Sequence, residues 1–171
     1  MAFIVEDGTG VADANSYIEV AWADTYFTDR GNTDWADAST SGKQVALIRA
    51  TDYIDATYVF IGIKGSSAQG LEWPRTYAID IYGEELTGVP TILKKAVAET
   101  AVRALAGELI EDFDSQGRIK RERVEGAVEV EYGGDGALQM KSFPYVDRLL
   151  MGSGLVEYKN GSTGQRKIIR T

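Results

Sequence analysis

Few residues in this sequence could do chemistry. It contains no cysteine and no histidine, which excludes disulfides, thiolate metal sites and the Ser-His and Cys-His mechanisms of nucleophilic catalysis. Carboxylates are abundant, with 26 Asp and Glu residues, but neighbours such as Glu84 and Glu85 give no signal of a shared proton, and we interpret them as solvated charge. We therefore expect no catalytic residues and no enzymatic activity.

One acidic segment resembles the start of a calcium-binding loop. Residues 112–117 read DFDSQG, with Asp112, Asp114 and Gly117 at the loop positions that would suit the metal. The bidentate Glu that should close such a loop is replaced by Arg123. We interpret the segment as a polar turn, and the sequence predicts no metal and no cofactor.

The segment 71–80, LEWPRTYAID, allows two interpretations. Trp73, Arg75 and Tyr77 could form a stacking surface for the bases of single-stranded nucleic acid. Alternatively, Trp73 is buried against helices, Pro74 fixes the direction of the chain and Arg75 pairs with an acid. We favour the second interpretation, in which Trp73, Pro74 and Arg75 form a structural brace.

The last residues of the chain differ in charge from all the others. The net charge is −8, yet residues 159–171 contain no acid, so the preceding part carries −12. The cations of this tail are Lys159, Arg166, Lys167 and Arg170. The tail could be a disordered end, a hook for nucleic acid or a strand that needs a partner.

The acidity of the rest of the chain and two isoleucines separate these three interpretations. An acidic protein repels phosphate, which argues against a nucleic-acid hook. A plain disordered end has no need of apolar residues. We predict a flexible linker followed by a segment that becomes ordered on a partner through these residues: Arg166, Lys167, Ile168, Ile169 and Arg170.

Helical periodicity and end signals predict the elements that must carry these residues. A first helix is expected over 16–29, with Ser16 as N-cap and Glu19 completing a capping box. A second is expected over 40–58, capped by Thr40 or Ser41, and a long third over 89–110. A short final helix covers 143–152, and residues 30–39 and 59–88 are expected to be loops.

The period changes from helical to alternating at residues 118–132. Valines alternate with glutamates there, and Glu125–Gly126 could supply a turn, so we predict a β-hairpin. An isolated hairpin is marginally stable in water, so this one is expected to pack on the helices or pair with another subunit. The residues assigned to this inter-subunit hairpin are Lys120, Arg121, Arg123, Val128, Val130 and Tyr132.

The predicted fold is mainly α: a small helical bundle of about four helices with a β-hairpin and an extended C-terminal tail. Residues 1–152 form one domain that includes the hairpin, and residues 153–171 form a flexible linker and docking tail. No stretch approaches the roughly 18 apolar residues of a membrane span, and the N-terminus lacks the features of a signal peptide. We expect no membrane association.

Several stretches taken in order resemble a known family. They are FIVEDGTGVADANSYIEVAWADTYFTDRGN, LIRATDYIDATY, LEWPR, VPTILKKAVAETAVRALAG and IKRERVEGAVEVEY, which together lie within residues 3–132. In this order they resemble the head–tail connector (adaptor) proteins of tailed bacteriophages, whose members are sometimes catalogued as DnaT-like single-stranded-DNA-binding proteins. The sequence departs from the family's usual pattern after about residue 133.

The resemblance implies a structural virion protein, assembled in the host cytoplasm and located in the phage neck. Identical subunits would form a ring, usually a dodecamer, beneath the portal protein. The ring would extend the channel for genomic double-stranded DNA, which passes without specific binding, towards a downstream tail or stopper protein. The alternative function is a single-stranded-DNA-binding accessory protein that uses Trp73, Arg75 and the basic tail.

Overall fold

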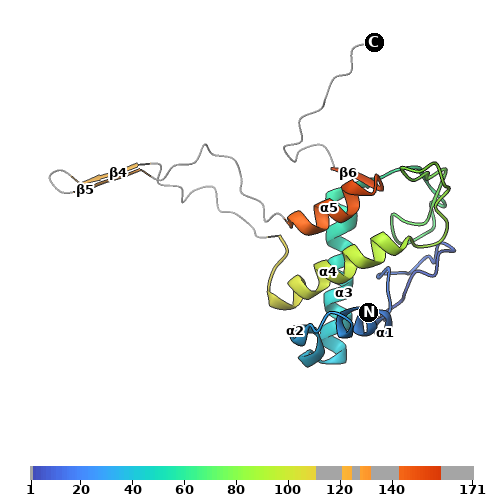
Figure 1. Ribbon diagram of the computed structural model, residues 1–171, viewed down its shortest axis with the longest axis horizontal. Coiled ribbons are helices and arrows are strands. Elements are labelled where there is room, and N and C mark those ends of the chain that lie inside the picture. The colour runs from blue at the N-terminus through green and yellow to red at the C-terminus, as the bar shows by residue number, and fades with distance from the viewer. Residues whose placement is uncertain (1, 111–120, 125–127, 132–142, 159–171) are drawn as a thin grey trace, which may run out of the picture. The chain divides into compact units, whose positions relative to one another are not determined.

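The computed structural model (Figure 1) describes residues 2–110, 121–124, 128–131 and 143–158. The chain divides into a body, formed by Met1–Leu109 and Phe143–Thr171, and a second unit, Ile110–Ser142. The described residues form five helices and six short strands. The helices are α1 (Val20–Thr28), α2 (Thr33–Asp37), α3 (Thr40–Thr57), α4 (Thr91–Ala106) and α5 (Pro144–Gly152). The prediction of a mainly helical protein is confirmed.

The centre of the body is the packing of α3 against α4, with α5 beside α4 (Figure 1). Small side chains alternate with large ones along both helices, so the two backbones can approach closely. The following residues of α3 and α4 are buried: Ala46, Leu47, Ala50, Ile54, Leu93, Ala96, Val97 and Ala101. The apolar stripe seen in the sequence of the long helix therefore faces the core.

The ends of three helices differ from the sequence-based prediction. Ser16 is not an N-cap: it is buried, its backbone bridges Val5, and its hydroxyl donates to the carbonyl of Ile18 at 2.8 Å. Helix α1 therefore begins only at Val20. Helix α3 is capped one residue earlier than expected, by Ser39, whose hydroxyl accepts from Gly42 N at 3.1 Å.

Helix α4 ends at Ala106, earlier than predicted, because α3 supplies its C-terminal partners. The guanidinium of Arg49 donates to the carbonyls of Ala104 and Gly107, each at 3.0 Å. These bonds satisfy carbonyls that a longer helix would have satisfied with its own backbone. The short helix α2 lies in a stretch predicted as loop, where Asn32 caps it by accepting from Trp35 N at 2.9 Å.

Short strands lie where the sequence predicted only loop and linker. They are β1 (Tyr58–Phe60), β2 (Ile63–Lys64), β3 (Arg75–Thr76) and β6 (Val156–Tyr158). Strands β2 and β3 pair antiparallel, and so do β1 and β6. Residues 153–158, assigned to the linker from sequence, thus belong to the body, with Leu155 and Val156 buried.

The hairpin predicted in the second unit is confirmed. Strands β4 (Arg121–Val124) and β5 (Val128–Glu131) pair antiparallel in a sheet of their own. The register places Arg121 opposite Glu131 and Arg123 opposite Glu129, so residues of opposite charge face each other across the ladder. Lys120, Tyr132 and the calcium-like segment 112–117 lie outside the described residues.

No helix within the described part of the chain is both long enough and apolar enough to cross a bilayer.

Candidate functional site

The predicted brace residues lie inside the body rather than on a nucleic-acid surface. Trp73 is fully buried, and its indole N–H donates to the carbonyl of Gly88. Arg75 donates to the carboxylate of Glu72 at 3.2 Å, and its side chain is mostly buried. No base can stack on a ring that has no exposed face, so Trp73 cannot take part in the stacking surface considered for Trp73, Arg75 and Tyr77, whereas the Tyr77 ring is exposed.

A buried polar network fastens this segment to the helices. The hydroxyl of Tyr17 donates to Asp55 Oδ1 at 2.6 Å and accepts from Trp73 N at 3.1 Å. The second oxygen of Asp55 accepts from Glu72 N at 3.0 Å. Burial, and then the Asp55 carboxylate, raise the pKa of Tyr17, so the hydroxyl stays protonated and available as a donor.

A buried carboxylate organises the N-terminal loop in the same manner. Glu6 is 2% exposed and accepts from the backbone N–H groups of Gly8, Gly10 and Val11 at 2.8 to 2.9 Å. All three bonds are local, so the carboxylate closes a loop and does not present a reactive group. Among the described residues, no group of three or more acidic side chains is placed to hold a metal ion.

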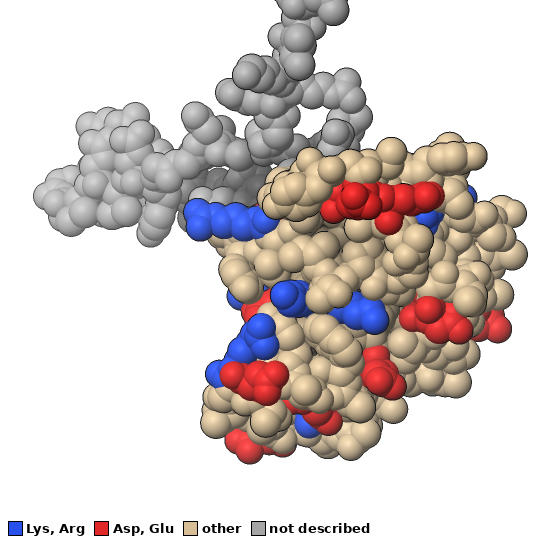
Figure 2. Space-filling model, turned by 45° about the vertical axis from the view of Figure 1, so that its right-hand side comes forward, with Lys and Arg blue, Asp and Glu red and all other residues tan. Residues whose placement is uncertain are grey.

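The cations of the described body are mostly paired with carboxylates. Lys43 contacts Asp24 at 2.9 Å, and Arg103 contacts Glu99 at 3.1 Å. On the face in Figure 2, cationic and anionic groups are interspersed over the described body. That distribution gives no continuous basic track for a phosphate backbone.

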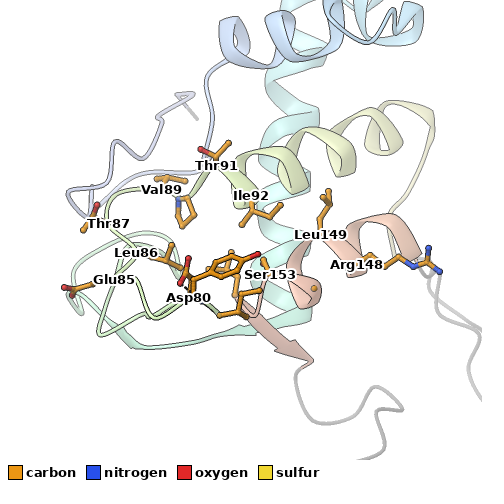
Figure 3. A pocket seen from close by; sticks show the side chains of 15 residues that line it. Asp80, Glu85, Leu86, Thr87, Val89, Thr91, Ile92, Arg148, Leu149 and Ser153 are labelled. Carbon is orange, nitrogen blue, oxygen red and sulfur yellow. Dashed lines mark hydrogen bonds between the residues drawn. The ribbon is translucent and has the colours of Figure 1, made fainter.

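An apolar groove lies between the segment 80–92 and helix α5 (Figure 3). It has a volume of about 760 Å³. Its apolar lining residues include Leu86, Val89, Ile92, Leu149 and Leu155. Glu85 and Arg148 lie at opposite ends of the groove and extend away from it (Figure 3).

A tight turn shapes one wall of this groove. The carboxylate of Asp80 accepts from Tyr82 N at 2.8 Å and from Glu84 N at 3.0 Å. Gly83 has φ +89°, a left-handed conformation that glycine adopts without strain. The turn carries Ile81 and Tyr82, which are exposed and also line the groove.

Exposed apolar side chains surround this turn, and we call them the apolar loop surface. The exposed fractions are 75% for Tyr77, 55% for Ile79, 60% for Ile81 and 83% for Tyr82. Exposed apolar side chains grouped on one short segment make it a candidate surface for contact with another molecule. Asp80, Glu84 and Glu85 lie in the same segment, so the surface is apolar and acidic.

The two other sets of predicted site residues remain predictions. The tail residues Arg166, Lys167, Ile168, Ile169 and Arg170 lie outside the described residues. The described hairpin residues lie in the paired strands β4 and β5. Their role between subunits stays a prediction.

Sequence reasoning missed the groove and the apolar loop surface. Residues 59–88 were interpreted as a loop packed through its aromatic residues. The alternation of Ile79 and Ile81 with Asp80 in that loop was the available signal, because exposed apolar residues with no helix to bury them need another partner.

Comparison with known proteins gives a match to a protein family. A family model described as "Putative DnaT-like ssDNA binding protein" matches residues 1–171. No curated protein and no solved structure matches the chain.

Proposed function

The chain belongs to the family described as "Putative DnaT-like ssDNA binding protein". We propose that this protein is a structural adaptor in the neck of a phage. The family description itself names single-stranded-DNA binding and no virion role. The adaptor proposal comes from the sequence resemblance and is supported by the character of the surface. Its partners would be identical subunits in a ring, usually twelve, a portal protein and a downstream tail or stopper protein.

The observation that carries this proposal is the apolar loop surface with its acidic neighbours. A surface that binds single-stranded nucleic acid combines exposed aromatic rings with cations that follow the backbone. Here Tyr77 and Tyr82 are exposed beside Asp80, Glu84 and Glu85, which would repel phosphate. The same residues suit a contact between proteins, where apolar side chains become buried.

The proposed assembly assigns a task to each part of the chain. The body would supply the wall of the ring, and the apolar loop surface would contact a neighbouring subunit. The hairpin β4–β5 would gain the partner that a two-stranded sheet needs. The tail would dock to the portal, while the negative net charge of −8 keeps genomic DNA from adhering to the channel.

A substitution pair tests the contact between subunits. Replacing Ile79 and Ile81 by serine should abolish ring formation with portal, because both side chains lose the apolar area that the contact buries. Val45, which is 54% exposed on α3, provides the matched control: Val45→Ser should assemble normally. Native mass spectrometry of each protein with portal gives the result. Rings of unchanged mass and yield from the double variant would refute the proposed contact.

Removal of the tail tests the portal contact separately. A chain that ends at Tyr158 should keep the body folded, because β6 is complete at that residue, and should lose binding to portal. Circular dichroism reports the fold, and co-sedimentation reports the binding. If the shortened chain binds portal as tightly as the full chain, the docking role of the tail is wrong.

Single-stranded-DNA binding is the second candidate, favoured by the family description. The residues best suited to it lie on α1, where the Trp22 and Tyr26 rings stack at 5.4 Å and the Arg30 guanidinium lies 3.5 Å from the Tyr26 ring centroid. Trp22 is partly exposed and could stack on a base.

A binding assay at low salt separates the two candidates. DNA binding predicts a shifted band with oligothymidine that weakens steeply as salt is added and is reduced by Trp22→Ala. Adaptor function predicts no band, and Trp22→Ala should assemble with portal as the parent does. A salt-sensitive complex lost in Trp22→Ala would favour the second candidate.

A further inference from the structure

The groove beside α5 has apolar walls and an acidic end, but nothing in the described body fills it. Leu86, Val89, Ile92 and Leu149 supply much of its lining. Glu85 at one end is exposed and forms no ion pair with any other described residue. The opposite end carries Arg148, so an occupant that matches this groove carries adjacent apolar side chains and places its cations at the Glu85 end.

The chain itself contains one segment of that kind. Residues 165–171 read QRKIIRT, with Ile168 and Ile169 between Lys167 and Arg170. We propose that this segment of the same chain occupies the groove in the free protein. The two isoleucines would cover the apolar walls, and the cations would lie towards Glu84 and Glu85.

The length of chain between the body and the segment permits this arrangement. Strand β6 ends at Tyr158, and Ser153 and Leu155, only a few residues earlier, line the groove. The residues between Tyr158 and Gln165 can span about 20 Å when extended. They include Gly161 and Gly164, which allow the chain to reverse direction. The segment can therefore return to the groove from which its strand departs.

The short connection also favours the chain's own segment over that of a second copy. A short linker gives a tethered segment an effective concentration in the millimolar range, well above that of free protein in dilute solution. In the free protein the groove would then be occupied, and a partner that binds the segment would compete with the groove for it. This inference concerns the isolated chain and does not depend on the proposed adaptor function.

A disulfide between introduced cysteines tests the proposal cleanly, because the chain contains no cysteine of its own. Thr87→Cys lies at an exposed position of the groove (Figure 3), and Thr171→Cys leaves both isoleucines in place. With oxidised glutathione as the oxidant, the full chain should form an intramolecular disulfide, seen as a faster-migrating monomer on a non-reducing gel. The matched control adds Ile168→Asp and Ile169→Asp, which keep the tether but remove its apolar side chains.

The expected result is a rate of cross-linking at least about tenfold higher in the parent pair than in the aspartate control, as the burial of even one isoleucine would give. Equal rates would mean that only the tether brings the cysteines together, and they would overturn the proposal. Disulfide-linked dimers as the main product in dilute protein would also overturn it, because the occupant would then be a second copy.

Charge reversal at Glu85 provides a second, independent test of the proposal. Glu85→Lys in the same cysteine pair should slow cross-linking severalfold, whereas Asp37→Lys on α2, an exposed acid away from the groove, should leave the rate unchanged. Thermal unfolding of each reduced variant checks that the body is intact. Equal effects of the two reversals would overturn the assignment of the tail's cations to this end of the groove.

Discussion

At the scale of single residues, buried polar groups hold the loops of this protein in place. Tyr17 and Asp55 fasten residues 72–73 to the body, and Glu6 closes the N-terminal loop on itself. A partly exposed ion pair such as Lys64–Glu72, at 3.4 Å, contributes little by comparison, because solvent screens both charges. Residues in the first group are therefore the ones whose replacement should destabilise the fold.

The first prediction concerns the hydroxyl of Tyr17. Tyr17→Phe removes the acceptor of Trp73 N–H and the hydroxyl that donates to Asp55 Oδ1, at a site where Tyr17 is 1% exposed. We expect the free energy of unfolding to fall by about 1–3 kcal/mol. Urea denaturation measures the loss. Tyr82→Phe, at an 83% exposed position, is the control and should change stability by no more than about 0.5 kcal/mol.

The second prediction concerns the pH dependence that Tyr26 confers. Burial, and then the hydrogen bond to Glu99 at 3.0 Å, raise the pKa of Tyr26 to about 12. Since the pKa in the folded state exceeds the unfolded value of about 10, the neutral hydroxyl contributes stability that is complete below about pH 10. That contribution is lost as pH rises towards about 12.

Urea unfolding of the parent and of Tyr26→Phe, repeated from about pH 9 to about pH 11.5, would reveal this loss. As pH increases, the free energy of unfolding of the parent should fall relative to that of Tyr26→Phe. A difference that stays constant across this range would show that Tyr26 does not titrate in the manner described.

Sequence reasoning at this scale could identify which residues are buried more readily than what they contact. Burial of Trp73 followed from its size and from the proline beside it. Its partner, the carbonyl of Gly88, belongs to a loop whose path no local pattern specifies. For Ser16 the local pattern predicted the wrong role. Its spacing to Glu19 fits a capping box, but Ser16 forms a backbone bridge to Val5 and is buried.

At the scale of elements, the small sheets depend on turns that only certain residues can form. Gly62, between β1 and β2, has φ +77°. A Cβ atom at this position would lie 2.6 Å from Thr76 O and 2.9 Å from Ala78 N. The turn thus brings backbone so close to β3 that a side chain has no room.

The third prediction compares two glycines with similar backbone angles. Gly62→Ala should destabilise the body by more than the ~1 kcal/mol expected from a left-handed backbone alone, because backbone atoms block the new methyl group. Gly83→Ala, at φ +89° with no atom within 4 Å of the added Cβ, should show only the smaller effect. Thermal unfolding of both variants measures the two losses of stability. Equal losses would contradict the steric argument.

Long helices were predictable and short strands were not, for a physical reason. Helices α3 and α4 contain several turns, so their apolar periodicity repeats often enough to be recognised. Strand β1 contains three residues and pairs with β6, with Phe60 opposite Val156. A strand this short carries no pattern of its own, and its partner lies too far along the chain to be inferred.

At the scale of the whole molecule, the body contains the core. The buried apolar residues of the body lie within residues 14–109 and 146–156. The groove likewise combines the segment 80–92 with α5 and the residues after it. Because two stretches far apart in the chain meet there, the candidate site could not be assembled from sequence, although each stretch contains visible apolar residues.

The fourth prediction follows from this division. Replacing residues 111–141 by a short Gly-Ser linker should leave the melting temperature of the body within a few degrees of the parent, because none of its described core residues is removed. The same variant should lose ring assembly with portal if the hairpin contacts a neighbouring subunit. Calorimetry and native mass spectrometry give the two results. A large fall in melting temperature would show that the second unit stabilises the body.

The packing of α4 against α5 also has an evolutionary consequence. These helices flank the second unit along the chain, so both ends of that unit are connected to the body. Doubling the length of a loop between fixed ends costs only about 0.6 kcal/mol of additional closure entropy. Insertions and deletions between α4 and α5 would therefore be tolerated by selection for stability, and this part of the gene is free to diversify with the partners it meets.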